Sequence, residues 1–223
     1  IGRSLCRQLG ERGAVVTILD NFYRAGTYGL ANKKGLEWCE WWPGSATDFA
    51  NVWDAAKKKD IVFNLAGNVA GITHNMKNQS QMFVDNILIK IAVTQAMQVS
   101  QHLECFLDVS TACVYPRHAG VPTPENTTRS STGPWDPEDT NFGYGVAKLG
   151  GELLTSHLPI KHLIARPSNT YGPFDFFGPG CHVIPALIQR IAGRENPLQM
   201  WGGGTQTRTF VYVDDMALAM LEF

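Results

Sequence analysis

The stretch DIVFNLAG, residues 60–67, belongs to a set of short apolar runs that alternate with longer amphipathic segments. The others are AVVTILD at 14–20, ECFLDVST at 104–111 and HLIARPSN at 162–169. Runs that are apolar throughout, rather than at every second position, are typical of strands buried on both faces of a parallel sheet. Helical patterns separate these runs, notably at 47–59, 80–100 and 144–157. This alternation predicts an α/β fold with a doubly wound parallel sheet.

The composition is that of an ordinary globular protein, with 223 residues, 44% hydrophobic and 17% charged, and a formal net charge of -1. The charges form no basic cluster, so nucleic acid is not an expected partner. The longest apolar runs are far shorter than the roughly 20 residues that span a membrane, so no membrane association is expected. The cysteines and histidines show no metal-ligand or redox spacing, which predicts reduced thiols, a cytoplasmic location and no metal site.

Small or polar residues follow each predicted strand, and ligands of doubly wound sheets bind at the carboxyl ends of the strands. Asp20 ends its run eighteen positions after Gly2. A carboxylate at this place suits the 2′-hydroxyl of a dinucleotide ribose, and a turn or helix cap is the alternative role. The other residues at strand ends are Ala66 with Gly67, Ser110 with Thr111, and Pro167 to Asn169.

Within NFGYGVAKLGGELL, residues 141–154, Tyr144 and Lys148 are four positions apart and project from one face of the predicted helix. A free tyrosine has a pKa near ~10, which makes it a poor base at neutral pH. A neighbouring ammonium group is expected to lower that pKa toward the working range. The pair alone is a common pattern, and a hydroxyl at a strand end, from Thr111 or Ser110, makes it far more specific.

Several segments follow one another in the order of a known family. They are IG at 1–2, NLAG at 64–67, STACVYP at 110–116, YGVAK at 144–148, RPSNTYGP at 166–173 and TRTFVYVDD at 207–215. In these segments the chain resembles the extended short-chain dehydrogenases/reductases, and among them the NAD-dependent sugar-nucleotide epimerases and dehydratases. The resemblance covers essentially the whole chain. It implies a Rossmann-type fold, an NAD or NADP cofactor, a nucleotide-diphosphate sugar as substrate, and a homodimer formed through helices 80–100 and 144–157.

The same resemblance implies roles for individual residues. Tyr144, as phenolate, would exchange a proton with a sugar oxygen that Thr111 also contacts, while Lys148 would lower the tyrosine pKa and hold the nicotinamide ribose. Arginine's fork suits phosphate oxygens, so arginines are expected at the diphosphate. The implied contacts to sugar and diphosphate are Asn169, Arg190 and Arg208. The implied cofactor contacts are Gly2, Asp20, Asn21, Leu65, Ala66, Gly67, Asn86, Ser110, Tyr144, Lys148 and Pro167.

Cys113 and His182 indicate one branch of the family. They stand where GDP-L-fucose synthases have the acid/base pair for epimerisation, and GDP-mannose 3,5-epimerases share the cysteine. Dehydratases of the family have Asp-Glu after the threonine, whereas this chain has Ala112 and Cys113, which disfavours dehydration. The resulting hypothesis is a nucleotide-sugar epimerase that acts through a keto-sugar intermediate. The alternatives are an NADPH-dependent epimerase/reductase, a UDP-sugar 4-epimerase and, least favoured, a non-catalytic dinucleotide-binding module.

The charge of Asp20 would repel a 2′-phosphate and favours NAD over NADP, although Arg24 lies nearby and would soften this preference. The chain opens inside one helical pattern and stops inside another, so we interpret it as a fragment that lacks the first strand and the C-terminal part. Residues 1–170 are expected to form the dinucleotide-binding domain. Residues 171–223 are expected to begin a smaller substrate-binding lobe, with a segment near 208–223 returning to the first domain.

Overall fold

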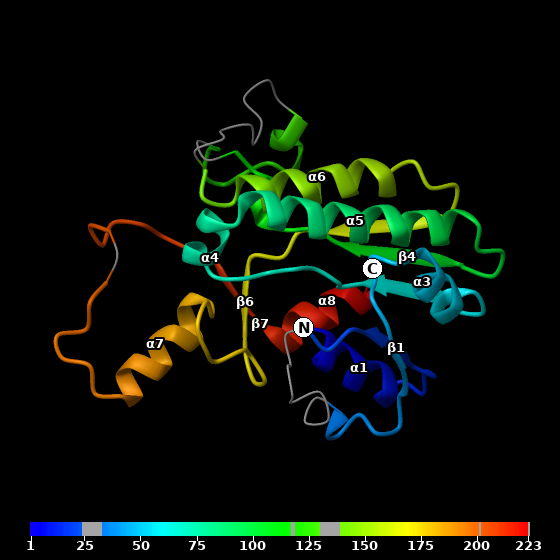
Figure 1. The fold of residues 1–223 in the computed structure, drawn as a ribbon, viewed down its shortest axis with the longest axis horizontal. Helices are drawn as coiled ribbons and strands as arrows, with labels where there is room; N and C mark the ends of the chain where they lie inside the picture. Colours follow the sequence, from blue (N-terminus) through cyan, green and yellow to red (C-terminus); the bar gives the residue numbers. More distant parts are fainter. Residues whose placement is uncertain (24–32, 117–118, 130–138, 201, 223) are drawn as a thin grey trace.

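The computed structural model describes residues 1–23, 33–116, 119–129, 139–200 and 202–222 (Figure 1). Arg24 therefore lies outside the described residues. All described strands pair in parallel, in three hydrogen-bonded groups. They are β1 (Thr17–Asp20) with β2 (Glu40–Pro43); β3 (Ile61–Asn64), β4 (Cys105–Val109) and β5 (Lys161–Ala165) in that order; and β6 (Asn169–Tyr171) with β7 (Phe210–Tyr212). The predicted α/β class with parallel strands is confirmed, in separate groups rather than as one continuous sheet.

Helices cover both faces of the β3–β4–β5 sheet, which is the doubly wound arrangement. Successive residues of a strand point to opposite faces. In β4, Phe106 packs with residues of α3 (Phe49–Ala56) and α5 (Gln79–Gln98), whereas Leu107 and Val109 pack with Met220. Met220 belongs to α8 (Val213–Glu222), which lies against α1 (Gly2–Glu11). In Figure 1, α5 runs beside α6 (Phe142–Thr155) above the strands, and α1 and α8 lie below them.

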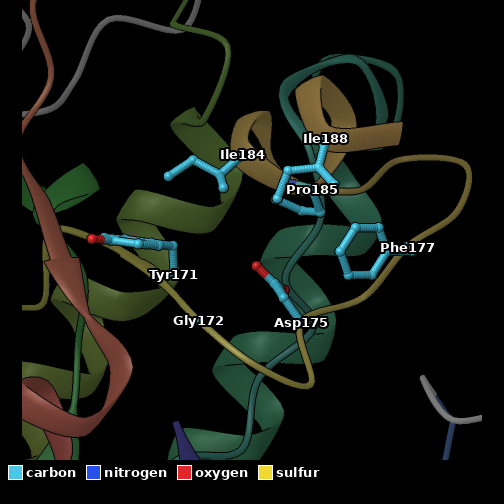
Figure 2. Close-up of a pocket in the computed structure, with 7 residues that line it drawn as sticks. All are labelled: Tyr171, Gly172, Asp175, Phe177, Ile184, Pro185 and Ile188. Atoms are coloured by element: carbon cyan, nitrogen blue, oxygen red, sulfur yellow. The ribbon is translucent and has the colours of Figure 1, made fainter. Parts of the chain in front are cut away.

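Residues after β5 form an extension and then return to the body of the molecule. The helix α7 (Val183–Ala192) stands apart from the layers in Figure 1. A hydrogen bond from Gly71 N–H to the Gly180 carbonyl, at 2.7 Å, ties its preceding loop to the short helix α4 (Ile72–Lys77). A cavity of about 90 Å³ lies beside α7 (Figure 2). Its lining residues are Tyr171, Gly172, Asp175, Phe177, Ile184, Pro185 and Ile188.

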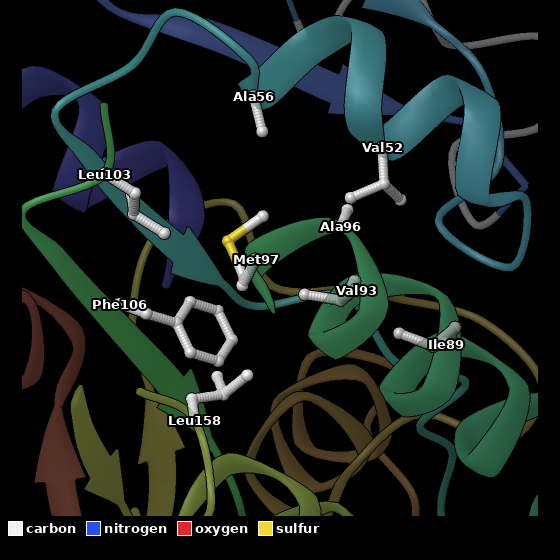
Figure 3. Packing of buried hydrophobic residues seen from close by; sticks show 9 residues of the cluster. All are labelled: Val52, Ala56, Ile89, Val93, Ala96, Met97, Leu103, Phe106 and Leu158. Carbon is white, nitrogen blue, oxygen red and sulfur yellow. The ribbon is translucent and has the colours of Figure 1, made fainter. Parts of the chain in front are cut away.

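The main hydrophobic core fills the space between α3, α5 and β4. Figure 3 shows Met97 and Phe106 near the centre of this cluster, with Val52 and Ala56 of α3 on one side. The N-terminus of α3 is capped by Asp48, whose carboxylate accepts a hydrogen bond from Ala50 N–H at 2.8 Å. Burial of such apolar surface stabilises a fold by about 25 cal/mol per Å², so this cluster fixes the position of α5 on the sheet.

The predicted helices at 80–100 and 144–157 correspond to α5 and α6, with ends shifted by a few residues. The sequence reading did not foresee α4, the strands β6 and β7, or the short 3-10 helices η2 (Ala112–Val114) and η3 (Glu125–Arg129). These elements are too short to show a clear hydrophobic period. Within the described part of the chain, no helix has the length and apolar character needed to cross a membrane.

Candidate active site

The loops that follow β4 and β5 are joined by backbone hydrogen bonds. Ser110 N–H donates to the Ala165 carbonyl at 2.7 Å, and Ala112 N–H donates to the Pro167 carbonyl at 3.2 Å. Thr111 lies between these two bonds and is the N-cap of η2, where its hydroxyl accepts from Cys113 N–H at 3.2 Å. The strand ends therefore hold Thr111 and Cys113 in a fixed turn.

Helix α6 brings Tyr144 against this turn. The side chain of Thr111 lies close enough to both the Tyr144 hydroxyl and the Cys113 thiol to lower the pKa of each. Close approach of the two elements depends on Gly145, because a Cβ at that position would lie 2.6 Å from the Cys113 carbonyl oxygen. The predicted association of Thr111, Cys113 and Tyr144 is thus present in the structure.

Lys148 lies one turn further along α6 and is 2% exposed. Its Nζ is 5.7 Å from the centre of the Tyr144 ring and donates a hydrogen bond to the Val109 carbonyl at 3.0 Å. A Cβ added to Gly67 would lie 3.3 Å from the same nitrogen, so the loop after β3 passes directly over the lysine. Tyr144, Lys148 and Gly67 are therefore neighbours.

The expected lowering of the tyrosine pKa by Lys148 is wrong. Burial, followed by the nearby Cys113, raises the pKa of Tyr144 above its ordinary value, and the Thr111 hydrogen bond only partly offsets this. Burial and then Lys90 lower the pKa of Lys148 to about 7. Because a buried lysine near a second lysine loses its proton easily, it supplies little positive charge to the phenol. Tyr144 is accordingly a protonated phenol at neutral pH.

The N-terminus of α1 faces the end of β3. Gly2 is the first residue of α1, and a Cβ there would lie 4.0 Å from Leu65. Helix N-termini present unpaired N–H groups and a partial positive charge, which bind phosphate. Leu65 precedes Ala66, whose N–H donates to the Asn64 side chain at 3.2 Å. These positions are compatible with the predicted cofactor contacts, which stay predictions.

Asp20 is exposed at the end of β1 and takes part in a turn. Its Oδ1 accepts a hydrogen bond from Phe22 N–H at 2.6 Å, and Asn21 Oδ1 accepts one from Tyr23 N–H at 3.0 Å. The capping role left open by the sequence is therefore present for Asp20. Its contact with a ribose stays a prediction that rests on the other carboxylate oxygen.

Two of the predicted cofactor residues have structural partners instead. Buried Asn86 accepts from Asn68 N–H at 3.1 Å and donates to the Asn68 carbonyl at 3.0 Å, which fixes the loop behind Gly67. The Ser110 hydroxyl donates to Glu152 at 2.5 Å. Asn86 therefore supports the loop beside the site, Thr111 rather than Ser110 lies against Tyr144, and cofactor contacts of Asn86 and Ser110 stay predictions.

The predicted acid/base pair, Cys113 and His182, comes from two distant parts of the sequence. His182 is the N-cap of α7, and the contacts described for Cys113 are with Thr111, Tyr144 and Asp139. Pairing of Cys113 with His182 therefore stays a prediction. Helix α4 links the two regions. Gly71, just before α4, bonds to Gly180 near His182, and Asn75 of α4 donates to Asn141 at the start of α6 at 2.8 Å.

The predicted phosphate ligands have different surroundings. Arg190 forms an ion pair with Glu195 at 2.5 Å, so its guanidinium group holds the end of α7 and its contacts give no support to a substrate role. Asn169 donates to the Thr209 carbonyl at 3.0 Å. Arg208 is exposed and donates to the carbonyl of Thr207 at 2.7 Å. Arg208 is therefore the better placed of the two arginines to meet a ligand.

The cavity shown in Figure 2 is not large enough for the proposed substrate. A water molecule occupies about 30 Å³ of liquid volume, so a cavity of about 90 Å³ holds only a few waters. None of its lining residues belongs to the group formed by Thr111, Cys113, Tyr144 and Lys148. We therefore assign it to packing around α7.

Sequence reasoning missed three polar residues around the site. Asp139 lies close enough to Cys113 to raise the pKa of that thiol, together with burial, which is the main cause. Lys90 and Asp108 form a buried ion pair beside Lys148. A signal was available for this pair, since each is a charged residue inside an otherwise apolar run, ILIKIAV at 87–93 and CFLDV at 105–109.

A doubly wound parallel fold with threonine, tyrosine and lysine gathered at its strand ends defines a protein of the short-chain dehydrogenase/reductase type. Residues 1–223, the whole chain, match the sequence model described as the NAD dependent epimerase/dehydratase family. The chain belongs to this family, which confirms the resemblance drawn from the motifs.

Three curated relatives give the degree of similarity. The chain is 35% identical to the probable GDP-L-fucose synthase 1 of Oryza sativa subsp. japonica, over 75% of this chain and 52% of the relative. It is 31% identical to the GDP-L-fucose synthase of Escherichia coli K12, over 99% of this chain and 65% of the relative. It is 32% identical to the GDP-mannose 3,5-epimerase of Arabidopsis thaliana, over 73% of this chain and 44% of the relative. The chain thus spans about half to two thirds of their lengths.

Solved structures agree on the fold. The epimerase Mth375 of Methanothermobacter thermautotrophicus has a TM-score of 0.84 and 27% identity, over 99% of this chain and 63% of that chain. The Bordetella bronchiseptica enzyme WbmG, in complex with NAD and UDP, has a TM-score of 0.74 and 21% identity, over 98% of this chain and 63% of that chain. The predicted Rossmann-type architecture is confirmed.

Proposed function

We propose that the protein is an NAD-dependent epimerase of a nucleotide-diphosphate sugar and that it acts through a keto-sugar intermediate. The observation that carries this proposal is the close grouping of Thr111, Tyr144 and Cys113, with Lys148 one helical turn away. The relatives named GDP-L-fucose synthase and GDP-mannose 3,5-epimerase support a GDP-sugar as the substrate. We also propose that the protein acts in the cytoplasm, where its cysteines would stay reduced.

The residues present fit an NAD molecule. The start of α1 at Gly2 offers a phosphate site, exposed Asp20 offers an acceptor for a ribose hydroxyl, and Gly67 leaves room beside Lys148 that a side chain would fill. Bound NAD supplies a hydride acceptor and, in its oxidised form, a positive charge. The carboxylate of Asp20 favours NAD over a 2′-phosphorylated cofactor.

Tyr144 and Thr111 would act on the sugar oxygen that becomes the ketone. A hydroxyl group that is oxidised loses its proton, and only the phenolate of Tyr144 could receive it. The raised pKa of the buried phenol would therefore have to fall when the positively charged cofactor is bound beside it, while Thr111 keeps the sugar oxygen in place. Because burial raises the pKa of Tyr144, the phenol also serves as the donor when the ketone is reduced again. Lys148 would hold the position of the ribose beside Gly67.

Cys113 and His182 would invert the neighbouring carbon. A hydrogen next to a ketone is acidic, so one residue removes it from one face and the other returns a proton to the opposite face. Burial raises the pKa of Cys113, so this residue enters the reaction as the protonated thiol and donates. His182 would then be the base. Ala112 has no acidic group with which to expel water, which argues against a dehydratase.

An epimerase/reductase that uses NADPH is the second candidate, favoured by the GDP-L-fucose synthases among the relatives. It uses the same Cys/His pair and differs in consuming reduced cofactor. Net loss of NADPH absorbance in the presence of the keto sugar separates it from an epimerase, which returns its cofactor unchanged.

Replacing Cys113 with alanine is expected to slow exchange of the sugar's ring hydrogen with solvent by about 10²-fold or more, because a positioned acid typically contributes about 10²–10⁴-fold. The full-length protein is incubated with GDP-sugars and UDP-sugars in deuterium oxide, and label uptake is followed by mass spectrometry. Cys105→Ala, at the opposite end of β4, is the matched control and keeps wild-type exchange. Wild-type exchange in Cys113→Ala would contradict the proposal, whereas epimerisation that persists in this variant without any exchange in the wild type would favour a 4-epimerase, which needs only Thr111, Tyr144 and Lys148.

We also propose a homodimer formed by α5 and α6 and a substrate-binding lobe that begins at residue 171. Apolar residues on the outer faces of these helices are exposed, including Leu88 at 44% and Leu153 at 63%. Exposed apolar patches of this kind mark protein interfaces.

The return of the chain to the first domain is supported by Gln8, whose side chain donates to the Asp214 carbonyl at 2.9 Å.

Leu153→Lys is expected to convert the dimer into a monomer, because a charge placed in an apolar interface loses its hydration. Size-exclusion chromatography with light scattering of the full-length protein measures the mass. Val15→Lys, at a position 90% exposed, is the control and stays dimeric. A dimer that persists unchanged in Leu153→Lys would place the interface elsewhere.

A further inference from the structure

A lysine and an aspartate are buried together behind the site. Lys90 of α5 is 1% exposed and Asp108 of β4 is 0% exposed, and their side chains form an ion pair. The carboxylate also accepts from the Asn64 side chain at 2.9 Å and from the Thr155 hydroxyl at 3.1 Å. Burying two charges costs more than a surface ion pair, and an apolar pair of similar size often stabilises a core as well or better. The pair therefore invites a role other than stability.

Lys90 and Lys148 meet at one carbonyl oxygen. Lys90 Nζ donates to the Val109 carbonyl at 3.1 Å, and Lys148 Nζ donates to the same oxygen at 3.0 Å. The two lysines are therefore close neighbours, and Lys90 lowers the pKa of Lys148. Asp108, the residue before Val109, is close enough to raise the pKa of Lys148, but it forms its ion pair with Lys90.

Helix α6 is shaped to admit the stem of Lys90. A Cβ at Gly151 would lie 2.5 Å from Cγ, 2.6 Å from Cδ and 2.8 Å from Cε of Lys90. Only a glycine leaves space for the aliphatic chain at this contact. Gly151 is one turn beyond Lys148 on the same helix, so the passage for Lys90 and the position of Lys148 are set by a single element.

We propose that Lys90 is a positioning residue for Lys148: by occupying the Asp108 carboxylate it keeps the Lys148 amine at Gly67 and Tyr144 instead of at Asp108. This inference rests on the proposed function only for the catalytic importance of Lys148. The contacts among Lys90, Asp108 and Lys148 do not depend on that function. The charged or titratable groups that face Lys148 are Lys90 from α5, Asp108 from β4 and, on its own helix, Tyr144.

These contacts predict the order of the Lys148 pKa values in the wild type and two variants. Burial lowers this pKa most, Lys90 lowers it further, and Asp108 raises it by less than Lys90 lowers it. Removing Lys90 alone leaves Asp108 to attract Lys148, so the pKa of Lys148 rises strongly. Removing both charges, in Lys90→Met with Asp108→Asn, gives a value between the wild type and the single variant. The asparagine keeps an acceptor oxygen for Asn64 and Thr155.

The experiment is an NMR titration of the full-length protein carrying lysine labelled with ¹³C at Cε, with Lys148→Met used to assign the signal. In the wild type the Lys148 signal titrates near pH 7. We expect the midpoint to rise in the order wild type, double variant, Lys90→Met. Thr155→Val removes a hydrogen bond from the same carboxylate without changing a charge, and is expected to leave the midpoint unchanged while lowering stability.

Turnover is measured alongside. Lys90→Met is expected to lower kcat at least tenfold with little change in KM for the nucleotide sugar, and the double variant is expected to recover most of it. An unchanged Lys148 midpoint in Lys90→Met would overturn the proposal, as would full kcat in that variant. If Lys90→Met does not fold, the double variant decides, since its midpoint must still exceed that of the wild type. A wild type inactive on every nucleotide sugar would refute the proposed function, while the titration would still decide the role of Lys90.

Discussion

Tyr144→Phe is expected to lower kcat by about 10³-fold while leaving KM for the nucleotide sugar within a factor of about three, because a positioned acid/base group contributes about 10²–10⁴-fold to the rate. The substitution removes one oxygen from a buried side chain that lies beside Thr111. The ring, its packing and the neighbouring Lys148 stay in place. The loss would therefore come from the missing proton transfer.

Steady-state kinetics of the full-length protein measure this effect. Tyr115→Phe is the matched control, since the hydroxyl of Tyr115 is hydrogen-bonded to Arg166 at 3.2 Å and belongs to no proposed role in the reaction. Its kcat is expected to stay near that of the wild type. If Tyr144→Phe kept more than about a third of wild-type kcat, proton transfer by Tyr144 would be ruled out.

Gly145→Ala is the second large effect, and it acts through the contact of α6 with η2. The new Cβ would lie 2.6 Å from the Cys113 carbonyl oxygen, which is far inside van der Waals distance. The helix must move, and Tyr144 moves with it away from Thr111. We expect a loss of about 1–3 kcal/mol in the free energy of unfolding, as for overpacking elsewhere, and a loss of kcat that exceeds what instability explains.

Gly150→Ala, on the same helix, is the control. Its Cβ would meet only the end of the Ile87 side chain, at 3.2 Å, which can rotate away. Alanine has a higher helix propensity than glycine by up to about 1 kcal/mol, so this variant is expected to be as stable as the wild type or more stable. Urea unfolding and kcat are measured for both variants. Equal stability and activity of Gly145→Ala and Gly150→Ala would show that the α6–η2 contact does not control the site.

The sequence predicted the fold well where patterns were long. Continuous apolar runs gave the parallel strands, and α5 and α6 were found because helical periodicity persists over many residues. The short elements β6, β7 and α4 were missed for the opposite reason. The grouping of the strands into separate parallel parts also depends on which strands pair, which periodicity does not encode.

The sequence predicted that three residues of the candidate site lie together, but it did not predict their electrostatics. Thr111, Cys113 and Tyr144 were expected together and lie together, because strand ends and an i, i+4 pair are readable from spacing. The pKa of Tyr144 was expected to fall and instead rises, because burial and the proximity of Cys113 both depend on tertiary packing. Arg190 was expected to contact a phosphate. In the structure its guanidinium group forms an ion pair with Glu195, five residues further along the chain.

A crystal structure of the full-length protein with NAD and a nucleotide-diphosphate sugar tests the proposed chemistry most directly. We expect the Tyr144 hydroxyl and the Thr111 hydroxyl both to lie about 3 Å from one sugar oxygen, within hydrogen-bond distance. A sugar seated away from Tyr144, with its oxygens beyond the reach of both hydroxyls, would contradict it.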